Sequence, residues 1–92
     1  MAQLAVTPNG PGSWRVEVVD DDGRTTSHVV SVPADLLADL GLEEHRAEEL
    51  VHESFFFLLA REPATSIMSE FSLDVIGRYF PEYREEIAAA LS

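Results

Sequence analysis

The stretch WRVEVVDDDGRTTSHVVSV, residues 14–32, has the pattern of a β-hairpin, with two alternating segments on either side of an acidic turn. Side chains of a strand point alternately to its two faces, so every second residue lies on the same face. Thr26 and His28 share a face of the returning segment with two valines. The apolar face of this hairpin is predicted to comprise Trp14, Val16, Val18, Val30 and Val32.

The length of the turn decides which residues of the two strands pair. A two-residue loop would place Trp14 opposite Ser31. A three-residue loop at residues 21–23 places Trp14 opposite Val30, which brings apolar side chains together. Gly23 can take the left-handed backbone conformation that the longer loop needs. The sequence therefore favours the three-residue loop.

The rest of the chain is predicted to contain one more strand and several helices. The strand is expected around Leu4 and Val6, before two prolines and two glycines interrupt residues 7–13. Proline near a first helical turn and glycine at a helix end mark the later segments. The expected helices run from Pro33 to a stop at Gly41, from Glu44 to Arg61, from Ala64 to Glu70, from an N-cap at Ser72 to Phe80, and from Pro81 to Leu91.

These elements indicate an α+β fold, in which a small antiparallel sheet of two or three strands is followed by four to five helices packed on one face. Residues 1–92 are expected to form a single domain, with a β-hairpin or meander at 1–32 and a helical part at 33–92. The helical side of the core is predicted to comprise Leu36, Leu40, Leu50, Val51, Phe55, Leu58, Ile67, Phe71, Ile76, Phe80 and Ile87.

The charge balance is strongly acidic. Seventeen acids face six bases, all of them arginines, for a net charge of −11, and there is no cysteine. Such a field repels phosphate backbones, so a nucleic acid is not an expected partner. The expected partner is a protein, and a basic one suits the charge. A chain this small also gains burial by pairing with its own copy, so a homo-oligomer such as a homodimer is expected.

The hydropathy pattern predicts no contact with a membrane. The longest apolar run, residues 55–60, has six residues, whereas about twenty are needed to span a bilayer. The first ten residues lack the basic and apolar regions of a signal peptide. We therefore expect a cytoplasmic protein.

Three consecutive phenylalanines lie in HESFFFLLARE, residues 52–62. Adjacent residues on a helix point about 100° apart, so Phe55 and Phe57 can flank a buried side while Phe56 faces the polar side. Two interpretations remain open. Phe56 is covered within the chain, because the C-terminal helices fold back over it or because the helix ends early and Phe56 packs locally; or Phe56 belongs to an interface with another subunit or partner. The interface hypothesis comprises Phe56, His52, Glu49 and His45.

Histidine and glutamate on one side of this helix raise the question of a metal site. Glu48 and His52 are an i, i+4 pair that can reach one zinc ion. His45 and His52, however, are two turns apart, about 10 Å along the axis, and cannot bind one ion within the same helix. No catalytic sequence motif is present. We therefore predict no catalytic residue, metal ligand or cofactor, and keep a metal-dependent enzyme as an alternative.

Residues 28–59, HVVSVPADLLADLGLEEHRAEELVHESFFFLL, are predicted to form a strand, a proline, a helix, a glycine turn and a longer helix with Arg46 near its start. This arrangement resembles a ribbon-helix-helix protein. The resemblance implies DNA binding through polar residues of a strand that pairs with a second copy, here Ser27 and Ser31 with Val29 between them. This strand carries no lysine or arginine, and a preceding strand is already predicted to pair with it.

Residues 64–80, ATSIMSEFSLDVIGRYF, are similar to a helix-turn-helix, although the second helix offers only Arg78 as a base. The resemblances imply a small transcription regulator or an antitoxin, which is the second hypothesis for the function. The leading hypothesis is a non-enzymatic protein–protein interaction module. It accounts for the acidic surface and for Phe56 together.

Overall fold

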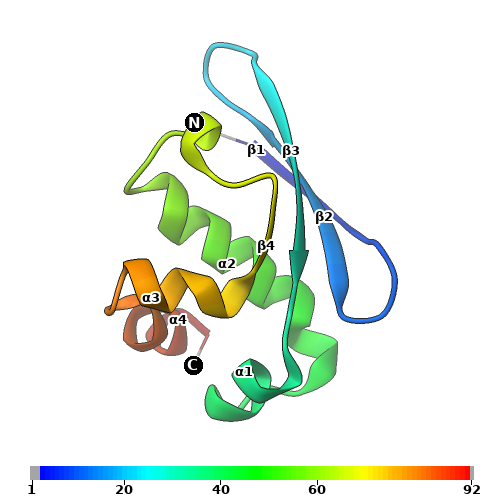
Figure 1. Ribbon diagram of the computed structural model, residues 1–92, viewed down its shortest axis with the longest axis vertical. Coiled ribbons are helices and arrows are strands. Elements are labelled where there is room, and N and C mark those ends of the chain that lie inside the picture. Colours follow the sequence, from blue (N-terminus) through cyan, green and yellow to red (C-terminus); the bar gives the residue numbers. More distant parts are fainter. Residues whose placement is uncertain (1–2, 92) are drawn as a thin grey trace.

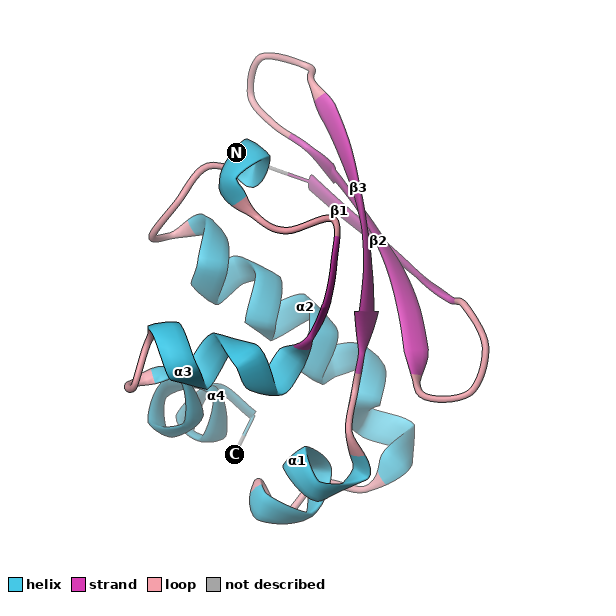
Figure 2. Cartoon of the chain, viewed as in Figure 1, coloured by secondary structure: helices cyan, strands magenta, loops and turns pink. Residues whose placement is uncertain are grey.

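The computed structural model describes residues 3–91 and shows an α+β fold (Figure 1). A four-stranded sheet forms one layer, and the helices lie together on one of its faces (Figure 2). The α+β class is confirmed. The sheet differs from the predicted antiparallel sheet of two or three strands in two ways. It has four strands, and one of its strand pairs is parallel.

Three strands of the sheet come from the N-terminal third of the chain. They are β1 (Gln3–Pro8), β2 (Ser13–Val19) and β3 (Thr25–Ser31), and they pair antiparallel in sequence order. Trp14 pairs with Val30, as the three-residue loop predicts. Gly23 takes a φ of 83°, in the left-handed region that favours glycine.

The fourth strand, β4 (Glu70–Ser72), runs parallel to β3 at the edge of the sheet. The prediction of a helix from Ala64 to Glu70 is therefore wrong. Only a single 3₁₀ turn, η2 (Ala64–Ser66), forms there. The backbone N–H of Val29 donates to the carbonyl of Ser69 over 2.8 Å, so the open edge of β3 draws this segment into the sheet.

The helices are shorter than predicted. α1 (Ala34–Asp39) ends two residues before Gly41, whose φ of 68° prevents the helix from continuing, as expected. The predicted helix from Glu44 to Arg61 consists of a 3₁₀ turn, η1 (Glu44–Arg46), followed by α2 (Ala47–Leu59). The C-terminal part contains η3 (Leu73–Val75), α3 (Ile76–Tyr79) and α4 (Tyr83–Leu91).

The core lies between the sheet and α2, with α4 behind α2. All five residues of the predicted apolar sheet face contact it; the four valines are buried and Trp14 is half-buried. Leu40, Phe71 and Phe80 are half-buried instead of buried. Two fully buried hydrophobic residues among residues 3–91 were missing from the predicted core, Leu73 and Tyr83.

Candidate functional site

Phe56 is exposed on the outer side of α2, with 46% of its surface accessible. Its neighbours Phe55 and Phe57 are buried, as the helical projection predicts. α4 packs against the side of α2 that carries Phe57, whose ring lies 5.3 Å from that of Tyr83. The C-terminal helices therefore do not cover Phe56, and α2 continues past it to Leu59. For residues 3–91, the interpretation that Phe56 is covered within the chain is wrong.

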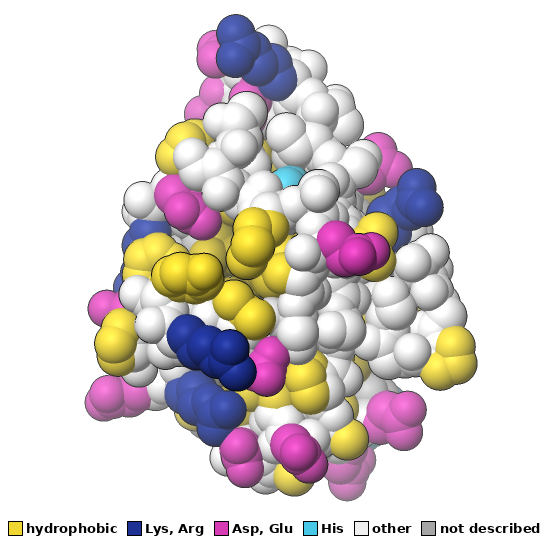
Figure 3. Space-filling view, in the orientation of Figure 1, with side chains coloured by type: hydrophobic (Ala, Val, Ile, Leu, Met, Phe, Trp, Pro, Cys, Tyr) yellow, Lys and Arg dark blue, Asp and Glu magenta, His cyan; other side chains and the backbone are white. Residues whose placement is uncertain are grey.

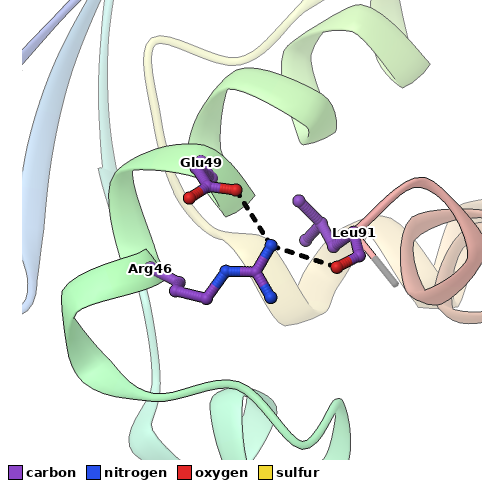
Figure 4. Close-up of polar contacts among 3 residues, drawn as sticks. All are labelled: Arg46, Glu49 and Leu91. Carbon is purple, nitrogen blue, oxygen red and sulfur yellow. Dashed lines mark hydrogen bonds and ion pairs between the residues drawn. The ribbon is translucent and has the colours of Figure 1, made fainter.

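Glu49 belongs to a polar contact that joins the start of α2 to the end of α4 (Figure 4). Arg46 donates to the Glu49 carboxylate and to the carbonyl of Leu91, each over 3.0 Å. The hydrogen bond and the charge of Arg46 lower the pKa of Glu49. A positively charged arginine at the last carbonyls of α4 also compensates the partial negative charge at the C-terminal end of that helix. Glu49 thus helps to hold α4 against α2.

The two histidines of the predicted surface have different surroundings. His45 is exposed and lies 3.2 Å from the Glu43 carboxylate. His52 is half-buried, and its ring lies 6.5 Å from that of Phe56. Within residues 3–91, no three His, Cys, Asp or Glu side chains are grouped closely enough to hold a metal ion.

His28, the third histidine, has a structural role. It is buried, and its Nδ1–H donates to the carbonyl of Met68 over 2.8 Å. The carbonyl can only accept, so Nδ1 carries the hydrogen of that bond, and Nε2 on the other side of the ring lies 2.9 Å from the Thr26 hydroxyl. His28 therefore joins β3 to the segment that precedes β4 and fixes the backbone at Met68.

An apolar hollow lies beside this fixed segment, between β4, α3 and the end of α2. Its volume is about 260 Å³. Met68 and Tyr79 stand at the hollow as two of the three large hydrophobic side chains that are exposed among residues 3–91, with Phe56 the third. The hydrophobic lining includes Leu58, Ile67, Met68, Phe71, Ile76 and Tyr79.

The surface around the hollow is visible from the β4 side of the molecule. Figure 3 shows hydrophobic side chains gathered there, with acidic and arginine side chains at the border. Glu62 contributes the charged group of the lining. The guanidinium of Arg61 is held away from the hollow by two contacts. It stacks over the Phe57 ring, 3.6 Å from the ring centroid, and it forms an ion pair with the Glu86 carboxylate at 2.7 Å. The hollow is thus an apolar patch with charged margins.

A second hollow, of about 550 Å³, lies between α1 and the start of β2. It is lined by Trp14, Leu37 and Leu42 among others, with Glu44 as its acid. None of the large exposed hydrophobic side chains lies in it. The hollow beside β4 is therefore the stronger candidate for a binding surface.

The hollow beside β4 was not predicted from the sequence. A short signal was present, since Phe71 and Leu73 alternate with the polar residues Glu70, Ser72 and Asp74 in the two-residue period of a strand. The predicted helix ended at Glu70 and the next was expected to begin at Ser72, so Phe71 was not assigned to a strand. Ser72 precedes η3, as the predicted N-cap does, but its side chain makes no capping bond.

The two frameworks that resemble DNA-binding proteins differ from the structure. β3 is flanked by β2 and β4, and Val29 and Ser31 both pair with β4, so these positions have no free edge for a second copy's strand. The segment expected to be the first helix of a helix-turn-helix is a 3₁₀ turn followed by β4.

Comparison with protein-family models, curated proteins and solved structures found no match for this chain. Within residues 3–91, each helix is too short or too polar to reach across a lipid bilayer.

Proposed function

We propose that this protein is a non-enzymatic protein–protein interaction module, and that the hollow beside β4 is its docking surface. The supporting observation is the apolar hollow itself, bordered by exposed Met68 and Tyr79. Exposed Met and aromatic side chains around a concave apolar surface are typical of contact centres between proteins. The rigid attachment of the Met68 backbone by His28 keeps the surface in shape before a partner binds.

The charge of the chain favours a basic partner for this surface. The net charge of −11 attracts a positively charged protein over a Debye length of about 8–10 Å at moderate salt. In this proposal an apolar side chain of the partner fills the hollow, and basic residues of the partner face the acidic side chains of its border. The association rate should then fall as salt increases, because the attraction between the two surfaces is screened.

Replacing Met68 with glutamate is expected to weaken partner binding at least tenfold without unfolding the protein. The new carboxylate would lie at the apolar hollow and would lose hydration when a partner covers it. Met68 is 46% exposed and its hydrogen bond to His28 uses the main-chain carbonyl, so the fold does not depend on its side chain. The measurement is affinity capture from the native host, followed by titration of each captured protein.

A second variant controls for the added charge. Ala90→Glu also adds one negative charge, at an exposed position of α4 outside the hollow. A genuine partner should be retained by the unmodified protein and by Ala90→Glu, and lost with Met68→Glu. If all three proteins retain the same partners with equal affinity, the hollow is not the docking surface.

A further inference from the structure

β1 forms an open edge of the sheet and carries no charge. It is the outermost strand, with β2 on its inner side. Residues 3–14 contain no charged side chain, although the whole chain has a net charge of −11. Proteins usually protect exposed edge strands with charges, because unpaired N–H and C=O groups there can pair with another strand. β1 lacks that protection along most of its length.

The hydrogen bonds of the sheet show which backbone groups point outward. The N–H of Asn9 donates to the carbonyl of Ser13, its cross-strand partner next to β1. Bonding direction alternates along an antiparallel strand, so Ala5 and Thr7 also face β2. The N–H and C=O groups of Leu4 and Val6 therefore point away from β2 at the open edge.

We propose that this edge binds a second copy of the chain, with two β1 strands pairing antiparallel about a twofold axis at Ala5. In this register Leu4 of one copy is opposite Val6 of the other, and Gln3 is opposite Thr7. The outward N–H and C=O groups of Leu4 and Val6 then satisfy those of the twin strand, forming four hydrogen bonds across the axis. The result is a continuous sheet of eight strands.

The register is supported by the side chains and by Pro8. Pairing about Ala5 places apolar residues together on the helical face and polar or small residues together on the other face. Shifting the axis to Val6 would place Leu4 opposite Pro8, which has no N–H, and would leave the Leu4 carbonyl without a donor. The strand is therefore complementary to itself in one particular register.

The charge distribution also makes this edge a more favourable place for a second copy than the acidic regions of the surface. Two chains of net charge −11 repel each other wherever acidic surfaces meet. β1 is a place where two copies can approach without setting like charges opposite one another. A basic partner, in contrast, gains nothing from an uncharged strand edge.

Helix α2 extends the proposed interface beyond the strand. α2 packs against β1, and its half-buried Leu59 joins Leu4 and Val6 at the margin of the core. His52, Phe56 and Leu59 follow one another at helical spacing along the outer side of α2. Phe56, which is 46% exposed, belongs to this outer side of α2. A twin bound at β1 thus comes close to exposed Phe56 and can cover it.

Cysteine substitution tests both the dimer and its register. The chain has no cysteine of its own. Two Ala5 residues at the twofold axis form a non-hydrogen-bonded pair, with Cα atoms about 4.5 Å apart, which is within the range that a disulfide spans. Oxidised glutathione should therefore convert Ala5→Cys to a disulfide-linked dimer of twice the 10.2 kDa chain mass.

Thr7→Cys is the matched control, since Thr7 is exposed on the same sheet face two residues away. In the proposed register the two Thr7 residues are separated by about 13 Å along the strands, too far for a disulfide. We expect Ala5→Cys to cross-link at least tenfold faster than Thr7→Cys under the same conditions. Equal rates, or a faster rate for Thr7→Cys, would overturn the proposal.

The unmodified protein provides a test without cysteine. Light scattering after size exclusion should give a dimer mass, and Phe56→Glu should raise the dimer dissociation constant at least tenfold while the circular dichroism spectrum stays unchanged. A mass of 10.2 kDa at every concentration up to about 1 mM would refute the dimer. Met68→Glu should leave the dimer intact, because the hollow beside β4 lies at the other edge of the sheet. The dimer and the proposed docking function can therefore fail independently.

Discussion

Replacing Phe55 with alanine is expected to lower the free energy of unfolding by about 3–5 kcal/mol, the usual cost of removing a buried phenylalanine side chain. Phe55 is completely buried where α2 meets the sheet. Its ring lies 5.5 Å from that of His28 on β3 and 6.0 Å from that of Phe71 on β4. The substitution would open a cavity beneath the segment that forms the hollow, so it should also weaken partner binding there.

The same substitution at the next residue is the control. Phe56→Ala removes an equal side chain from a position that is 46% exposed, so it should cost less than about 1 kcal/mol in the monomer. Urea unfolding measures both values, at a protein concentration where the chain is monomeric. Similar losses at the two positions would contradict the burial of Phe55 and the exposure of Phe56. A loss of about 4 kcal/mol would remove much of the 5–15 kcal/mol that stabilises a typical domain.

Raising the pH from about 10 to 12 is expected to destabilise the fold by about 2 kcal/mol through Tyr83. Its side chain is fully buried, and its hydroxyl shares a 2.6 Å hydrogen bond with that of Ser54 on α2. Burial raises the pKa of Tyr83 to about 12, from an ordinary value of 10.0. One pKa unit corresponds to about 1.4 kcal/mol.

The sign follows from the protons bound by each state. Between pH 10 and 12 the unfolded chain has lost the Tyr83 proton and the folded chain retains it, so stability falls as pH rises. Below pH 10 both states are protonated and this contribution is fully present. The chain contains no lysine, whose titration near pH 10.4 would obscure the effect.

Urea unfolding at several pH values between 8 and 12 measures this dependence, and Tyr83→Phe is the control. The phenylalanine variant keeps the packing against Phe57 but has no proton to lose, so its stability should change much less over the same pH range. It should be less stable at pH 8, by about 1–2 kcal/mol, because Ser54 loses its partner. If the free energy of unfolding falls with pH at the same slope in the variant and in the unmodified protein, ionisation of Tyr83 is not the cause of the destabilisation.

The sequence alone determined the N-terminal hairpin and the direction of the helical faces. The apolar pairing of Trp14 with Val30 and the glycine at position 23 specified the register, since both act within a few residues of the turn. The projection of α2 correctly separated buried Phe55 and Phe57 from exposed Phe56. These features depend on local geometry, which a sequence records directly.

Only the tertiary structure decided what lies beside β3 and how the candidate surfaces are built. β4 pairs with a strand about 40 residues earlier, as Val30 and Phe71 show. The sequence of so short a segment does not reveal which distant edge will accept it. His28, the hollow beside β4 and the open edge at β1 all follow from that sheet order. Local patterns specified the strands and helices, whereas backbone pairing between distant segments specified the surfaces at which the protein is proposed to act.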